Sequence, residues 1–156
     1  MDVGEVAVRQ AGVEDVADAA RLLHDFNAEY DEPTPEAPVL AEHLRRLLAG
    51  GEIVLLLAGE GPDGVAQLRL FTSIWSGEPD AYLAELYVVP ERRGQGVGRA
   101  LLDAAIETVR AAGATHIELT TGEDDVEARS LYESSGFTNL EGGDGGPRML
   151  YYERDL

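Results

Sequence analysis

The sequence predicts an α/β fold on one mixed sheet of six to seven strands, mostly antiparallel with a central parallel pair, and about four helices on both faces. Apolar runs of strand length alternate with segments whose apolar residues recur at helical spacing. A Gly- and Pro-containing turn at 59–64 joins two such runs as a hairpin. Residues 82–121 follow the order strand, glycine turn, helix, strand, which is a βαβ unit and predicts the parallel pair.

The first half predicts a strand, two helices and the hairpin. The first strand covers residues 5–9, and a helix then begins at 12–15. Its apolar stripe is Val16, Ala19, Ala20, Leu23 and Phe26. Three prolines end this helix, and a second helix with Leu40, Leu44, Leu47 and Leu48 on one face ends at Gly50 and Gly51. The hairpin strands are 53–58 and 65–74.

The second half predicts strands and helices in alternation. These are a strand at 82–89, a helix at 101–112, a strand at 116–121, a helix at 126–135, a strand from Phe137 and a last strand at 149–153. The glycine-rich residues 141–147 are predicted to be a loop within the domain and not a linker to another domain, because only one short strand follows them. The whole chain, 1–156, is therefore predicted to be a single domain.

A glycine-rich turn follows the strand at 82–89 directly. Its residues are Arg93, Gly94, Gln95, Gly96, Val97, Gly98 and Arg99. Glycine lets the backbone approach an anion, and the free N–H groups of a first helical turn point at it, so this turn predicts a phosphate site with two arginines beside it. A P-loop is excluded because the chain has no lysine, and a dinucleotide motif is disfavoured because Arg99 stands where its last glycine belongs.

A second motif lies later in the chain, at residues 128–137. The run Ala-Arg-Ser-Leu-Tyr-Glu-Ser-Ser-Gly-Phe carries Tyr132 on a helix that ends at Gly136. With Arg93-x-x-Gly96-x-Gly98, it resembles the GCN5-related N-acetyltransferase (GNAT) family, and the element order resembles that fold throughout. The resemblance implies an acetyl-CoA-dependent N-acetyltransferase that binds the cofactor's pyrophosphate at the glycine turn.

The same resemblance implies roles for further residues. Main-chain groups of Leu86, Tyr87 and Val88 would pair with the pantetheine arm of the cofactor, and an amide near Val88 would hold the oxyanion. Tyr132 would protonate the leaving thiolate, although it could also pack as a core aromatic. Asp125 stands where the family often has an asparagine that touches the cofactor, and capping of the last helix is the alternative.

Glu85 is the predicted base for the amine. Regular alternation places it with Leu83 and Tyr87 on one face of a central apolar strand, where a carboxylate usually has a function or a partner. The partner would be Arg69 on the preceding strand. Some family members instead use a glutamate on the strand after the glycine-turn helix, but the comparable residue here is Thr120.

The acceptor pocket is predicted from aromatic residues with carboxylates around them, a setting that suits an amine cation. Its candidates are Phe26, Tyr30, Trp75 and Tyr82. The expected acceptor is a primary amine on a small cationic molecule such as an aminoglycoside or a polyamine. Two alternatives stay open: a non-catalytic domain that senses acyl-CoA, and acetylation of protein N-termini or lysines.

The composition limits the classes of partner that the protein is expected to bind. A net charge of -18 disfavours nucleic acid, although acid-rich, lysine-free composition also fits a GC-rich or salt-adapted source. The chain has no cysteine, no apolar stretch of membrane-spanning length and no signal-like start, so we expect a cytoplasmic protein without a membrane partner. The three histidines lack ligand spacing, so no metal is expected, and a homodimer is left open.

Overall fold

A five-stranded sheet in the order β1-β2-β3-β4-β5 organises the first part of the chain. The structure is a computed structural model that describes residues 4–156. The strands are β1 (Val8–Gln10), β2 (Val54–Ala58), β3 (Gly64–Thr72), β4 (Pro79–Val88) and β5 (Ile117–Leu119). The helices are α1 (Val16–Glu29), α2 (Ala37–Ala49), α3 (Val97–Ala111) and α4 (Val126–Ser134), with 3-10 turns η1 (Val13–Asp15) and η2 (Pro90–Arg92).

The chain divides into two compact units. The first ends at Leu119 and holds the sheet with α1, α2 and α3, while the second runs from Thr120 to Leu156 and holds α4. The single domain over 1–156 stays a prediction.

Strand pairing confirms a mixed, mostly antiparallel sheet. Neighbouring strands from β1 to β4 are antiparallel, and β4 and β5 are parallel, with Ala81 opposite Ile117 and Leu83 opposite Leu119. The prediction of six to seven strands is wrong, because residues 4–156 form five. The parallel pair also lies at the edge of the sheet and not at its centre.

The two missing strands were predicted after Gly136 and at 149–153. Gly136, Gly142, Gly143 and Gly145 all have positive φ, a backbone conformation that does not continue a strand, so only four residues lie between Gly136 and the loop. An isolated bridge between Leu140 and Arg148 forms there instead of a ladder. Residues 149–153 form no strand because a strand needs a partner edge, which an apolar sequence pattern alone does not provide.

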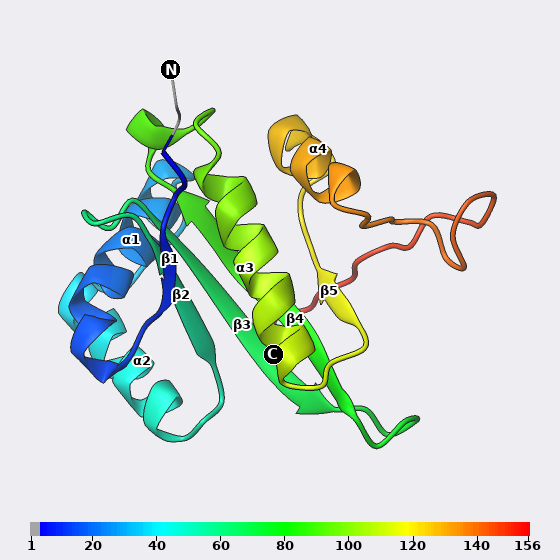
Figure 1. Cartoon of the computed structure of the whole chain (residues 1–156), viewed down its shortest axis with the longest axis horizontal. Helices are drawn as coiled ribbons and strands as arrows, with labels where there is room; N and C mark the ends of the chain where they lie inside the picture. The colour runs from blue at the N-terminus through cyan, green and yellow to red at the C-terminus, as the bar shows by residue number, and fades with distance from the viewer. Residues whose placement is uncertain (1–3) are drawn as a thin grey trace. The chain divides into compact units, whose positions relative to one another are not determined.

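Helices cover both faces of the sheet in the first unit, as predicted (Figure 1). On one face, buried residues of α1 and α2 pack on Leu55, Leu57, Val65 and Tyr87. On the other face α3 crosses so closely that a Cβ on Gly64 would lie 2.8 Å from Leu101 Cδ1. Pro38 stands in the first turn of α2, where its missing N–H costs nothing, and α2 ends at Gly50 as predicted.

A register shift interrupts the pairing of β3 with β4. Gln67 lies opposite Glu85, but the next residue, Leu68, lies opposite Leu83, so Ala84 is an extra residue in β4. Paired residues share a face and successive residues of β3 alternate, so Leu83 lies on the face opposite Glu85. The predicted alternation, with both on one face, is therefore wrong beyond the bulge.

The bulge has a second consequence. Tyr82 lies opposite Arg69, which is on the same face of β3 as Gln67, and Asp80 lies opposite Phe71 on that face as well. Tyr82 and Asp80 therefore join Glu85 and Tyr87 on the face that α1 partly covers. The rule of strict alternation had separated Tyr82 from Glu85.

Candidate active site

The glycine turn forms an open cradle before α3. Gly94 has φ 74°, Gly96 has φ 85°, and a Cβ on either would meet nothing within 4 Å. The helix starts at Val97, four residues earlier than predicted, so Gly98 and Arg99 belong to its first turn. The first helical hydrogen bond is Ala100 N to Gly96 O, at 3.0 Å. Within residues 4–156 the amides of Gln95, Gly96, Val97 and Gly98 donate no backbone hydrogen bond.

This cradle fits the diphosphate of acetyl-CoA. Free N–H groups at a helix N-terminus bind anions through hydrogen bonds and the helix dipole. Glycine at Gly94 and Gly96 leaves the space that a side chain would fill. The cofactor, when bound, supplies a thioester that an amine can attack.

Arg93 connects the cradle to two other elements. Its Nη2 donates to Glu29 Oε1 at the end of α1, at 2.8 Å, and its Nε donates to the carbonyl of Val88, at 3.0 Å. The guanidinium also lies 5.6 Å from the ring centre of Tyr87. Contact between Arg93 and a phosphate stays a prediction. The sequence offered no signal for Glu29, because residues 29 and 93 meet only through the fold.

Tyr87 packs under this ion pair. Its side chain is 5% exposed, its ring centre lies 5.0 Å from that of Phe26, and its hydroxyl donates to Glu29 Oε1 at 3.4 Å. Burial, and then the nearby Glu29 carboxylate, raise the pKa of Tyr87. Tyr87 therefore stays a neutral phenol that fixes the end of β4 against α1.

The strand before the cradle has one free edge. β5 pairs with β4 only at Ala81, Tyr82 and Leu83, while β3 pairs with β4 as far as Val88. Beyond the bulge, Leu86, Tyr87 and Val88 thus have no strand partner on the β5 side within residues 4–156. A peptide-like arm can add to such an edge through main-chain hydrogen bonds, as expected for pantetheine.

Glu85 lies on β4 between the bulge and this free edge. Its carboxylate has no hydrogen bond or ion pair with any residue in 4–156, so the predicted pair with Arg69 is absent. Burial raises the pKa of Glu85 above its ordinary value. A raised pKa makes a carboxylate a better proton acceptor near neutral pH, which suits a general base.

The predicted acceptor residues are only partly brought together. The Phe26 ring centre lies 5.5 Å from that of Tyr30, which extends the aromatic cluster begun with Tyr87. Tyr82 lies on β4 on the same face as Glu85. Trp75, in the turn between β3 and β4, is 92% exposed and makes no ring contact with this cluster.

In the second unit Tyr132 lies on α4. Its ring packs edge-on against Phe137, with ring centres 5.9 Å apart, and the amide of Phe137 donates to the Tyr132 carbonyl at 3.1 Å. Asp125 is the N-cap of α4, where its side chain accepts a hydrogen bond from Ala128 N at 3.3 Å. The capping role expected as an alternative for Asp125 is thus present, and contact with the cofactor stays a prediction.

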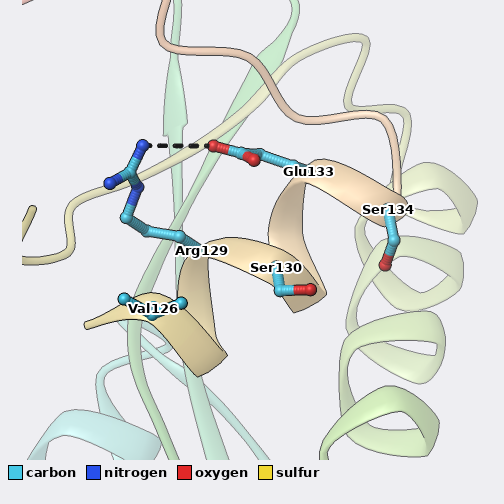
Figure 2. A pocket seen from close by; sticks show the side chains of 5 residues that line it. All are labelled: Val126, Arg129, Ser130, Glu133 and Ser134. Carbon is cyan, nitrogen blue, oxygen red and sulfur yellow. Dashed lines mark ion pairs between the residues drawn. The ribbon is translucent and has the colours of Figure 1, made fainter. Parts of the chain in front are cut away.

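A shallow hollow also lies along α4 (Figure 2). Its lining residues all come from this helix: Val126, Arg129, Ser130, Glu133 and Ser134. Arg129 and Glu133 form an ion pair at 3.6 Å across one helical turn, as the dashed line in Figure 2 shows. The hollow therefore carries one positive and one negative side chain.

In the part of the chain that the structure describes, no group of three or more His, Cys, Asp or Glu side chains could hold a metal ion. None of the helices within residues 4–156 is long and apolar enough to span a bilayer.

The cradle leads to a binding prediction. A Gly98→Val variant should bind acetyl-CoA about 10-fold more weakly or worse, because a branched side chain in the first turn of α3 obstructs the diphosphate. Gly96→Val should do the same, but its positive φ also strains the backbone. Calorimetric titration with acetyl-CoA measures both.

Gly51→Val is the matched control for Gly96→Val. Gly51 also has positive φ and open space around its Cβ position, but it follows α2. It should therefore show the strain in its melting temperature and leave acetyl-CoA affinity unchanged. Wild-type affinity in a folded Gly98→Val protein would rule out the cradle.

The fold, the open glycine turn and the free edge of β4 together fit an acyl-CoA-dependent transferase. Comparison with known proteins agrees, since residues 19–137 match the model of the acetyltransferase (GNAT) family. The chain belongs to this family of acetyl-CoA-dependent N-acetyltransferases.

Individual relatives support the assignment. The aminoglycoside N(6')-acetyltransferase type 1 of Stenotrophomonas maltophilia is 31% identical over 153 residues, which cover 96% of this chain and 93% of that protein. A mycothiol acetyltransferase of Beutenbergia cavernae is 41% identical over 88 residues, but the chain spans only 28% of its length. A solved structure from Arthrobacter sp. FB24, whose assignment as an acetyltransferase is provisional, has a TM-score of 0.88 and 46% identity, covering 96% of each chain.

Proposed function

We propose that this protein transfers the acetyl group of acetyl-CoA to the primary amine of a small molecule, such as an aminoglycoside, a polyamine or a related amine. The observation that carries the proposal is Glu85, a half-buried carboxylate with no hydrogen bond or ion pair to any residue in 4–156, beside the free edge of the strand that leads into the cradle. The Stenotrophomonas relative, named for an aminoglycoside, supports a small amine as the acceptor.

The residues divide the proton transfers between them. An ammonium group has no lone pair, so Glu85 accepts its proton, directly or through water. A main-chain N–H near Val88 stabilises the negative charge that develops on the carbonyl oxygen. Tyr132 donates a proton to the departing sulfur, the role that its motif position implies. Arg93 and the amides at the start of α3 orient the phosphates.

The experiment is a free-thiol release assay with acetyl-CoA and a panel of acceptors. The panel holds spermidine, an aminoglycoside, a single-amine acid and a lysine-containing peptide. Thiol release that depends on a small amine supports the proposal. Acetyl-CoA binding without amine-dependent release would favour a sensor domain, and release with the peptide alone would favour a protein acceptor.

A further inference from the structure

The face of the sheet that carries Glu85 is covered at one end and open at the other. Val65 and Gln67 on β3 are buried, with Gln67 8% exposed. The next residues on the same face, Arg69 and Phe71, are exposed, and Phe71 is 46% exposed. The bulge at Ala84 adds Tyr82 and Asp80 from β4 to this open end. We call Arg69, Phe71, Asp80, Tyr82 and Glu85 the acceptor face.

Arg69 differs from the other arginines between Arg9 and Arg148 in its lack of a polar partner among the described residues. It makes no hydrogen bond or ion pair with any residue in 4–156. Every other arginine from Arg9 to Arg148 has a hydrogen bond, an ion pair or another polar interaction. The chain has 30 acidic residues for 12 basic ones, so carboxylates that could pair with an arginine are abundant. Among the described residues, the fold nevertheless leaves the Arg69 guanidinium without a carboxylate partner.

The distance between Arg69 and Glu85 sets the spacing of the two ligand groups that could contact them. Glu85 lies opposite Gln67, and Arg69 is two residues further along β3 on the same face. Diagonal neighbours of this kind are about 7–8 Å apart. A ligand whose amine lies at Glu85 therefore reaches Arg69 with a group several carbon atoms away.

We propose that Arg69 binds an acidic group of the acceptor, so that the enzyme prefers amines with a carboxylate a few carbons away over the same amines without one. An arginine presents a planar fork of donors that matches a carboxylate. The inference rests on the proposed function and narrows its acceptor: polyamines and aminoglycosides lack the acid and become the poorer class. Tyr82, opposite Arg69, and Phe71 provide ring surface for the carbon chain between the two charges.

The test compares 6-aminohexanoate with 6-aminohexanamide, which share one primary amine and differ only in the charge of the far end. Wild-type kcat/KM should favour the acid by about 10-fold, the effect of one charge-assisted hydrogen bond. In Arg69→Gln the acid-to-amide ratio should fall close to one, mainly through KM, because this contact forms equally in the ground state and transition state. Arg69→Lys should keep part of the preference.

Arg46→Gln is the control variant. Arg46 lies on α2, is exposed, and within residues 4–156 its side chain pairs with Glu42 alone, so the acid-to-amide ratio should match the wild type. A ratio near or below one in the wild type, or an unchanged ratio in Arg69→Gln, would overturn the inference. If Arg69→Gln fails to fold, the acid-to-amide ratio of the wild type still tests whether the enzyme prefers the acid.

The two proposals fail in different ways. Turnover of spermidine or an aminoglycoside with no preference for the acid would remove the role of Arg69 and leave the proposed function intact. Absence of thiol release with every amine in the panel would overturn both.

Discussion

A Tyr132→Phe variant is expected to turn over about 100-fold more slowly than the wild type while its affinity for acetyl-CoA stays nearly unchanged. A phenol with a pKa of about 10 can donate a proton to a departing thiolate, and phenylalanine cannot. The substitution keeps the ring, so the edge-on contact with Phe137 remains. Steady-state thiol release measures turnover, and calorimetry measures the affinity.

Tyr152→Phe is the matched control, since Tyr152 is an exposed tyrosine outside the motif. It should behave like the wild type in both measurements. If Tyr132→Phe also turns over at the wild-type rate, the hydroxyl is not the proton donor and Tyr132 serves to pack α4 against Phe137.

Glu85→Gln is expected to lower turnover by about 100-fold, the usual scale of general-base catalysis. Glutamine keeps the shape of the side chain but does not accept a proton. A base must be ionised to act, so the wild-type rate should rise with pH through the pKa of Glu85. Burial raises this pKa, which places the rise above the ordinary range of a carboxyl group.

The rise of the rate with pH could come from ionisation of Glu85 or from deprotonation of the amine substrate. Acceptors of different basicity separate the two. A rising limb that stays in place across acceptors and disappears in Glu85→Gln identifies the carboxylate as the base. A limb that follows the pKa of each acceptor, with Glu85→Gln active, shows that the amine arrives deprotonated and that Glu85 is structural.

Measuring the stability of Glu85→Gln shows whether the variant loses turnover because it misfolds. Because the pKa of Glu85 is higher in the folded state, the folded protein holds its proton longer than the unfolded chain as pH rises. Wild-type stability therefore falls through the interval between the unfolded and folded pKa values and stays lowered above it. The variant lacks this penalty, so thermal melts at pH 7 should show it at least as stable as the wild type. The stability advantage of the variant should disappear at pH values below the pKa of Glu85 in the unfolded chain.

Local pattern predicted much of this protein. The apolar stripe of α1, the prolines before α2, the hairpin of β2 and β3 and the glycine turn before α3 all follow from residues near one another in sequence. Each depends on the conformational limits of glycine and proline or on the period of a helix or strand, which act over a few residues. The family resemblance, carried by two such motifs, was confirmed.

The tertiary structure decided how distant segments meet. The extra residue at Ala84 arises only when β4 pairs with β3, and it moves Tyr82 to the face of Glu85 because a single inserted residue reverses the side-chain alternation. Two further features likewise depend on which strands and helices pack together: the pairing of Arg93 with Glu29, and the lack of a partner for Arg69 in the part of the chain that the structure describes. The sequence by itself determined the chemistry of the cradle. The fold determined which charges surround the acceptor, because ion pairs between remote residues leave no periodic trace in the chain.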